Sequence, residues 1–192
     1  MVIKHIYDRF RWWKSTDRVG PDIPLTHVLF YFPDLARRFC EKKFAHFGKG
    51  AEIRPGATVV GCSRVSIGAN VIIRPGSFLG ADPGHAAGTI TIEDEVLMSP
   101  GVIIYTTDHD FTDPTRLISA QGDRPALPVH IKKGSWIGVN SVLLPGVTIG
   151  LNCVIGAGSI VTKDVPDFCV AVGNPARVVR KITVSETVKT NA

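Results

Sequence analysis

Residues 131–166 form six consecutive hexapeptides with no insertion or deletion between them. The first residue of each block is aliphatic, the fifth is small, and the fourth is glycine, asparagine or aspartate, which tolerate positive φ at a tight bend. A helix repeats about every 3.6 residues and a strand about every two, so neither explains a strict period of six. A coil with flat faces and sharp corners does. The tract therefore predicts a β-helix with a continuous apolar column inside.

Weaker copies of the repeat precede this tract, beginning at Ile53, Ile67 and Ile92. Because three hexapeptides make one triangular turn, we expect about five coils, two of them supplied by the perfect tract. A short polar insertion covers 80–89, and a longer insertion covers 110–128. Since stacked coils must stay in register, the longer insertion is expected to project outward, and a loop of this size in a compact fold is usually functional.

The first 48 residues lack the repeat and show helical spacing instead. Apolar residues from Ile3 to Phe10 follow that spacing, and a second helix is predicted to begin at Pro33. We interpret this segment as a short helical cap over the open end of the coil. The alternative is contact with a membrane surface, because Trp12 and Trp13 stand among basic residues.

The predicted organisation has three parts. The N-terminal cap covers 1–48, an all-β domain with the projecting loop covers 49–172, and a basic segment and tail cover 173–192. The formal net charge of +5 is mild, and no basic stripe is interleaved with aromatic residues, which argues against nucleic-acid binding.

The four cysteines are widely spaced and form no CxxC pair, which favours a reduced compartment over a disulfide framework. The N-terminus lacks the apolar stretch of a secretory signal, and no apolar run is long enough to span a bilayer. We therefore expect a cytoplasmic protein.

The region from Trp136 to Arg180 resembles the hexapeptide-repeat acyltransferases. The matching segments have the sequences WIGVN, LPGVTIG, IGAGSIVTKDVP and GNPARVVR, and an upstream match reads MSPGVIIYTTDH and ends at His109. The resemblance is strongest to the maltose, galactoside and xenobiotic acetyltransferases and to the O-acetyltransferases of bacterial surface polysaccharides. It implies a left-handed parallel β-helix, a homotrimer with sites between subunits, acetyl-coenzyme A as donor, a histidine base and no metal.

The function implied by this resemblance is acetyl transfer to a hydroxyl of a sugar in surface polysaccharide or glycan assembly. N-acetylation of an amino sugar and acetylation of an antibiotic hydroxyl are the enzymatic alternatives. A metal-dependent carbonic anhydrase on the same coil would need three convergent histidines with a His-x4-His pair, and the six histidines here contain no such pair. A purely structural β-helix would not need a histidine beside a projecting loop.

His109 is the candidate catalytic residue. It ends a hexapeptide immediately before the long insertion, where a sixth-position side chain faces outward. A neutral imidazole, whose ordinary pKa is about 6.5, can accept the proton of an attacking hydroxyl. Asp108 or Asp110 is expected to orient its ring. We assign contact with the acceptor to four residues near the insertions, namely Asp82, His85, Tyr105 and Asp110.

The donor residues follow from the matched motifs. In similar enzymes the positions of Lys163, Arg177 and Arg180 lie along the coenzyme A groove, where cations pair with phosphates. The resemblance also places Thr162, Ala157, Gly158 and Trp136 at the donor, with Trp136 covering apolar area at the subunit boundary.

Two departures from the family pattern concern the acceptor. Val139 stands where sugar-acetylating relatives often have serine, and 73–78 lacks the asparagines of the maltose and galactoside enzymes. Maltose and galactoside are therefore not assigned as acceptors.

Overall fold

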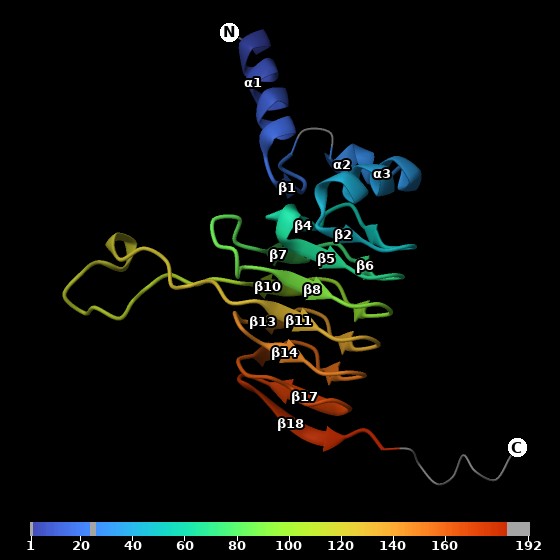
Figure 1. Ribbon diagram of the computed structural model, residues 1–192, viewed down its shortest axis with the longest axis vertical. Helices are drawn as coiled ribbons and strands as arrows, with labels where there is room; N and C mark the ends of the chain where they lie inside the picture. Colours follow the sequence, from blue (N-terminus) through green and yellow to red (C-terminus); the bar gives the residue numbers. More distant parts are fainter. Residues whose placement is uncertain (1, 24–25, 184–192) are drawn as a thin grey trace, which may run out of the picture.

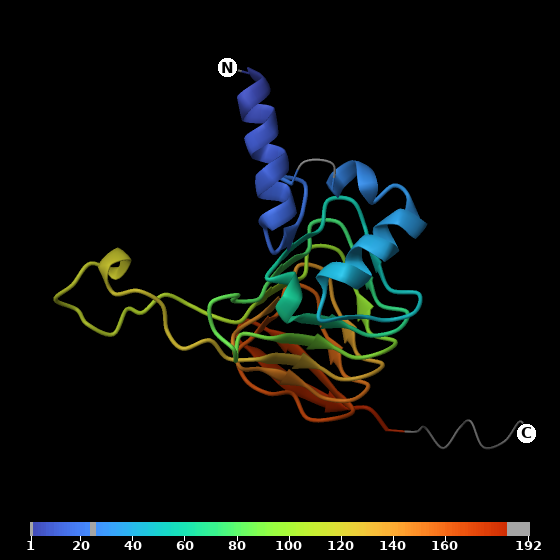
Figure 2. The same cartoon turned by 45° about the horizontal axis from the view of Figure 1, so that its top comes forward.

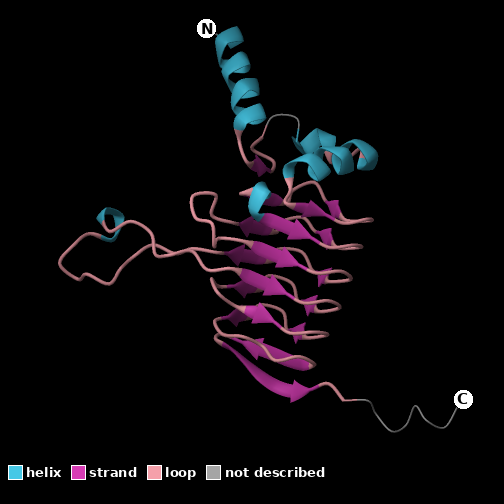
Figure 3. Ribbon diagram, in the orientation of Figure 1, coloured by secondary structure: helices cyan, strands magenta, loops and turns pink. Residues whose placement is uncertain are grey.

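Short parallel strands stack in three columns along the long axis of the molecule, and the chain passes through each column in turn (Figure 1). The computed structural model describes residues 2–23 and 26–183. Strands make up the body, the three α-helices lie at its N-terminal end, and a short 3-10 helix lies on a loop that projects from the body (Figure 3). We call the three columns the first, second and third faces, in the order in which the chain visits them.

The faces contain the following strands. The first face is β2 (His46–Phe47), β5 (Val65–Ile67), β8 (Ile90–Ile92), β11 (Val129–Ile131) and β14 (Thr148–Ile149). The second face is β3 (Glu52–Ile53), β6 (Ile72–Ile73), β9 (Leu97–Met98), β12 (Trp136–Ile137), β15 (Val154–Ile155), β17 (Cys169–Gly173) and β18 (Ala176–Lys181). The third face is β1 (Arg18–Val19), β4 (Thr58–Val60), β7 (Phe78–Gly80), β10 (Ile103–Tyr105), β13 (Val142–Leu143) and β16 (Ile160–Val161).

One strand from each face makes a turn of the coil, and β2 to β16 make five complete turns. This confirms the expected number of coils, the last two of which come from the perfect tract. The coil begins at His46, slightly before residue 49. Within the basic segment predicted after residue 172, β18 pairs antiparallel with β17. Residues 184–192 of the predicted tail lie outside the described part of the chain.

The core is a column of stacked aliphatic side chains. On the first face Ile67, Ile92, Ile131 and Ile149 lie in register on successive strands, and each is at most 1% exposed. They are first residues of their hexapeptides, so the repeat places one large aliphatic group per strand into the column. This arrangement buries apolar surface without interruption from coil to coil.

Fourth-position residues form the sharp corners. Gly134, Asn140, Gly146, Asn152 and Gly158 all have positive φ, as the repeat predicts. The sixth block differs, because the carboxylate of Asp164 instead accepts a hydrogen bond from the Thr148 N–H at 2.7 Å.

Upstream, Glu95 also has positive φ (58°), although a β-turn of this hand favours glycine or asparagine. Its carboxylate accepts a hydrogen bond from the Asn70 side-chain amide on the preceding coil at 2.7 Å. The corner at Glu95 therefore stacks on the corner at Asn70.

Three helices precede the coil: α1 (Val2–Ser15), α2 (Thr26–Leu29) and α3 (Pro33–Lys43). Ala36 and Cys40 of α3, with Phe30 and Phe44 on either side of it, join the apolar core. In contrast, α1 extends away from the coil beyond its end (Figures 1 and 2). No helix within residues 2–23 and 26–183 is long and apolar enough to cross a membrane.

Candidate functional site

Both insertions leave the coil at the same corner, between the third face and the first. The shorter one joins β7 to β8 and the longer one joins β10 to β11, so they belong to adjacent turns. The longer insertion projects from the body, as expected, and carries a short 3-10 helix, Ile118–Ala120 (Figure 1). The side chains predicted to touch the acceptor are therefore gathered along one edge of the molecule.

His109 lies on the stem of the projecting loop. Its backbone bridges Asp123 in antiparallel fashion, with flanking hydrogen bonds from Asp110 N to Gly122 O and from Arg124 N to Asp108 O, each 2.8 Å. The stem is thus a short two-stranded ribbon that holds His109 opposite Asp123. The His109 side chain is 79% exposed, which agrees with an outward-facing sixth position.

The imidazole of His109 is paired with a carboxylate. Its Nδ1 lies 2.7 Å from Oδ1 of Asp123. A carboxylate only accepts, so neutral His109 donates its Nδ1–H to Asp123, and the lone pair remains on Nε2. Nε2, which lies outside this pair, can therefore take up a proton.

The sequence predicts Asp108 or Asp110 as the partner of the His109 ring, but Asp123 occupies that place instead. The Asp110 carboxylate accepts hydrogen bonds from the backbone N–H (3.0 Å) and the hydroxyl (2.8 Å) of Thr112. These two bonds lower the pKa of Asp110. Asp110 therefore shapes the start of the loop. The turn signal at Gly122-Asp123 marked a reversal of the chain, but only the backbone pairing shows which residue faces His109.

A second histidine–carboxylate pair stands on the preceding turn. Nδ1 of His85 lies 2.7 Å from Oδ2 of Asp82, whose other oxygen accepts a hydrogen bond from the Gly84 N–H at 2.7 Å. Partial burial raises the pKa of Asp82, but these hydrogen bonds outweigh it and the net shift is downward. The Asp82 N–H in turn donates to Oγ1 of Thr106 at 2.9 Å, which ties the short insertion to the segment leading to His109.

Tyr105 ends β10 at the base of the projecting loop. Its ring packs on that of Phe78, with centroids 5.3 Å apart, and it remains partly exposed. A cavity of about 320 Å³ opens on the same corner, lined by Asp108, Arg124, Pro125, Leu127 and Pro145. Asp108 precedes His109 in the chain and Arg124 follows Asp123, so the cavity lies beside the His109–Asp123 pair.

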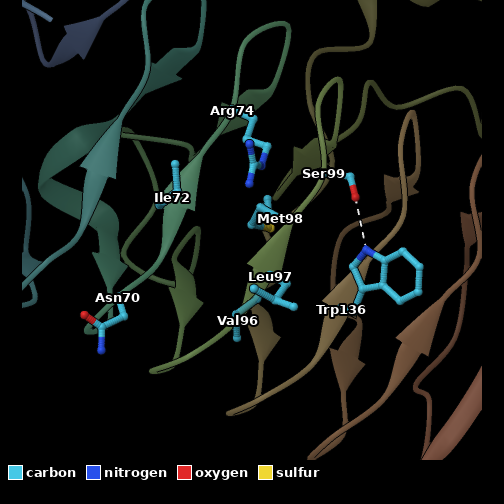
Figure 4. A pocket seen from close by; sticks show the side chains of 8 residues that line it. All are labelled: Asn70, Ile72, Arg74, Val96, Leu97, Met98, Ser99 and Trp136. Carbon is cyan, nitrogen blue, oxygen red and sulfur yellow. Dashed lines mark hydrogen bonds between the residues drawn. The ribbon is translucent and has the colours of Figure 1, made fainter.

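Trp136 lies on the second face, away from this corner. Its indole N–H donates to Oγ of Ser99 at 3.1 Å (Figure 4). Together they border a cavity of about 190 Å³, which is also lined by Asn70, Ile72, Arg74, Val96, Leu97 and Met98. Half of the indole remains exposed on this face.

The predicted donor residues are all exposed, and apart from Trp136 on the fourth turn they lie around the last turn and the terminal strand. Ala157 and Gly158 form the corner between the second and third faces, whereas Thr162 and Lys163 lie at the corner that carries His109. Because strands in a coil are spaced about 4.8 Å apart, Lys163 follows His109 by two turns, or about 10 Å along the axis. Arg177 and Arg180 lie on β18. A single chain therefore does not gather the donor residues at one corner.

Among the described residues, neither the cysteines nor the other side chains that could bind a metal ion form a catalytic or metal site. Cys40, Cys62, Cys153 and Cys169 are free and buried, and burial raises the pKa of the Cys62 thiol to about 12. Such a thiol stays protonated and is not a nucleophile at neutral pH. Among the residues that the structure describes, no three His, Cys, Asp or Glu side chains converge to hold a metal ion.

Known proteins share this repeat and this fold. Residues 128–163 match the family model "Bacterial transferase hexapeptide (six repeats)". The chain is 39% identical over 142 residues to galactoside O-acetyltransferase of Escherichia coli, a match that covers 74% of this chain and 66% of that protein. It spans about half the length of three other curated relatives that it matches.

Solved structures agree with the sequence comparison. A galactoside acetyltransferase in complex with coenzyme A superposes with a TM-score of 0.67 at 32% identity, covering 82% of this chain and 77% of that one. A maltose O-acetyltransferase from Clostridium difficile gives a TM-score of 0.64 at 30% identity, covering 94% and 86%. The chain belongs to the hexapeptide-repeat acetyltransferase family, and its parallel sheets and few helices fit a left-handed β-helix.

Proposed function

We propose that this protein transfers an acetyl group from acetyl-coenzyme A to a hydroxyl group, with His109 as general base. The observation that carries the proposal is the His109–Asp123 pair on the stem of the projecting loop, which leaves Nε2 available. Family membership supports the reaction class. The complexes of similar proteins with coenzyme A and with acetyl-coenzyme A support the donor.

In the proposed reaction, the acceptor oxygen attacks the carbonyl carbon of the thioester while Nε2 of His109 takes the hydroxyl proton. Asp123 holds the ring through Nδ1 and stabilises the imidazolium that forms. The tetrahedral intermediate then collapses, the carbon–sulfur bond breaks, and the sulfur takes the proton from Nε2. The products are the acetyl ester and coenzyme A with a free thiol, and the histidine returns to its neutral form.

For the donor we propose Lys163, Arg177 and Arg180 as phosphate-pairing cations. Thr162, Ala157 and Gly158 would contact the rest of coenzyme A, and Trp136 would cover it at the subunit boundary. Support comes from their exposure and from the separate corners and strands that they occupy. A site that spans those corners is completed when a neighbouring copy packs against the face between them.

The distribution of outward side chains supports a homotrimer as the proposed assembly. On the second face Leu97, Trp136, Val154 and Val170 form an apolar row in register across four strands. On the third face Phe78, Ile103, Val142 and Ile160 form another. The corresponding row on the first face is polar: His46, Ser66, Thr91, His130 and Thr148. Two different apolar faces per protomer suit a closed ring in which the second face of one copy meets the third face of the next.

The first turn of the coil would expose its core to water unless another segment packed over it. We propose that α2 and α3 form the N-terminal cap, because Ala36 and Cys40 join the core at the first turn. Val19 of β1 also joins that core, whereas α1 contributes none of its described side chains to it.

For the acceptor we propose a sugar hydroxyl of a surface polysaccharide or related glycan. The Asp82–His85 pair on the turn before His109 supplies fixed polar groups that can hydrogen-bond a sugar. Tyr105, with its partly exposed ring, and Asp110 complete the proposed contacts.

The test is release of coenzyme A from acetyl-coenzyme A across nucleotide sugars, oligosaccharides and chloramphenicol, followed by His109 variants on the acceptor that responds. His109→Ala and His109→Asn should each lower kcat by about 10²–10⁴-fold. His46→Ala, an exposed histidine on the first face, is the matched control and should be unaffected. Near-normal turnover by His109→Asn would rule out His109 as the base.

A further inference from the structure

The N-terminal helix α1 has no packing partner for its described side chains. From Lys4 to Trp12 each described side chain is exposed, including Ile6 (52%), Tyr7 (65%) and Trp12 (40%). Large apolar side chains on a helix of a folded protein normally face a core. Here the helix extends past the end of the coil, away from α2 and α3 (Figures 1 and 2).

The sequence of α1 combines apolar spacing with positive charge. Its apolar residues recur at Ile3, Ile6, Tyr7 and Phe10, the spacing of one helical face. The same segment contains four Lys or Arg residues and one acidic residue, Asp8. A helix with an apolar face, aromatic residues and a basic remainder is suited to the boundary between lipid headgroups and acyl chains.

We propose that α1 docks on the surface of a bilayer that contains anionic lipid, with its axis parallel to that surface. Its 14 residues span only about 21 Å, which is too short to cross the hydrocarbon layer. Charge complementarity selects anionic headgroups over neutral ones. The inference is independent of the acetyl-transfer chemistry, because α1 carries none of the proposed site residues.

A second copy of the chain is a less suitable occupant. The outward apolar rows lie along the sides of the coil, on the second and third faces, whereas α1 continues beyond the end of the coil along its long axis (Figure 1). Packing of those side faces leaves α1 outside the contact. The helix therefore stays free to reach a surface in the proposed assembly.

The experiment is co-sedimentation of the full-length protein with vesicles of equimolar phosphatidylglycerol and phosphatidylcholine, compared with pure phosphatidylcholine. Ile6→Asp tests the apolar contribution, and Arg11→Glu tests the charge. Leu35→Asp and Arg38→Glu are matched controls, since Leu35 on α3 is equally exposed (54%) and Arg38 is an exposed cation of the same helix. The native mass and coenzyme A release of each variant are measured without vesicles.

We expect binding to the anionic vesicles that both α1 variants weaken at least tenfold and both α3 variants leave unchanged. Raising the salt from about 0.1 M to about 1 M shortens the Debye length from about 10 Å to about 3 Å and should release the protein. The proposal is overturned if the wild type ignores anionic vesicles, if it binds neutral vesicles equally well, or if the α1 variants bind as the wild type does. A lower native mass of the α1 variants would also overturn it and would assign α1 to a second copy of the chain.

Discussion

His109 and His85 are both held through Nδ1 by a carboxylate, yet their settings differ. The partner of His109 comes from the opposite side of the loop stem, so the pair exists only while the stem is formed. The partner of His85 lies three positions before it in the same short insertion. A change in the loop would therefore alter the orientation of His109 and leave the Asp82–His85 pair in place.

Asp123 should matter for catalysis through the ring that it holds. Asp123→Ala removes a hydrogen bond to the imidazolium of the transition state, and such a bond to a charged group is worth about 1.5 kcal/mol. We expect kcat to fall roughly tenfold, less than for His109→Ala, with KM for acetyl-coenzyme A little changed. Steady-state kinetics of purified enzyme measure this.

Asp113→Ala is the control for loop damage, since the Asp113 carboxylate accepts hydrogen bonds from Thr115 within the same loop and makes no contact with His109. An equal loss of kcat in both variants would mean that loop order, rather than ring orientation, is responsible.

The sequence identifies His109 as a candidate base but does not identify its partner Asp123. The position of His109 follows from an unbroken hexapeptide and a matched motif, both of which are local. Asp123 lies on the far side of an insertion that has no periodicity, so its pairing depends on backbone hydrogen bonds that no spacing rule provides. The donor cations were also found from motifs, but their distribution over one corner and a terminal strand depends on how the last turn closes.

At the scale of single elements, two glycines at the second position of the hexapeptide show how closely the corners of successive turns can stack. A Cβ on Gly68 would lie 2.5 Å from the backbone N of Asp94 and the backbone C of Glu93 on the next turn. A Cβ on Gly138 would lie 2.6 Å from the backbone N of Ala157. At these two glycines the next turn approaches so closely that only a hydrogen fits, and the nearest atoms are backbone atoms, which cannot move aside as a flexible side chain can.

Gly68→Ala should therefore destabilise the fold, by about 1–3 kcal/mol as for other overpacked sites. The matched substitution is Gly84→Ala in the exposed short insertion, where the nearest atom is a side-chain oxygen of Asp82 at 3.2 Å. We expect Gly84→Ala to change stability by less than about 0.5 kcal/mol. Urea unfolding at one protein concentration checks both, and equal midpoints would contradict the close stacking of corners.

Regular elements were predictable wherever the period held, and less so where it failed. The perfect tract predicted β11 to β16 because each block supplies its own strand and corner. Glu95 was a mismatch to the corner pattern, yet it adopts positive φ because its side chain pairs with Asn70 on the preceding corner. The segment after residue 172 was described only as basic, whereas 176–181 form β18, since the strand depends on pairing with β17.

At the scale of the whole molecule, the outward faces carry information that the hexapeptide period does not. The repeat specifies which residues point inward, and it leaves the sixth position, which is the outward residue of each two-residue strand, open to selection. Two outward rows are apolar and one is polar, and in a lone protomer the apolar rows would contact water. Exposed apolar rows are typical of surfaces that contact another protein, which supports the proposed assembly.

Leu97 is 63% exposed and begins the second-face row beside Trp136, so Leu97→Asp places a charge in the proposed interface and should shift a trimer toward monomer. Thr91→Asp changes the polar first face on the same turn and should leave the mass unchanged. Sedimentation equilibrium at micromolar concentration measures both. Because the proposed donor site spans neighbouring copies, Leu97→Asp should also lose coenzyme A release in proportion to the lost trimer. A monomeric wild type would contradict the assembly, and a fully active monomeric Leu97→Asp would show that one chain contains the whole site.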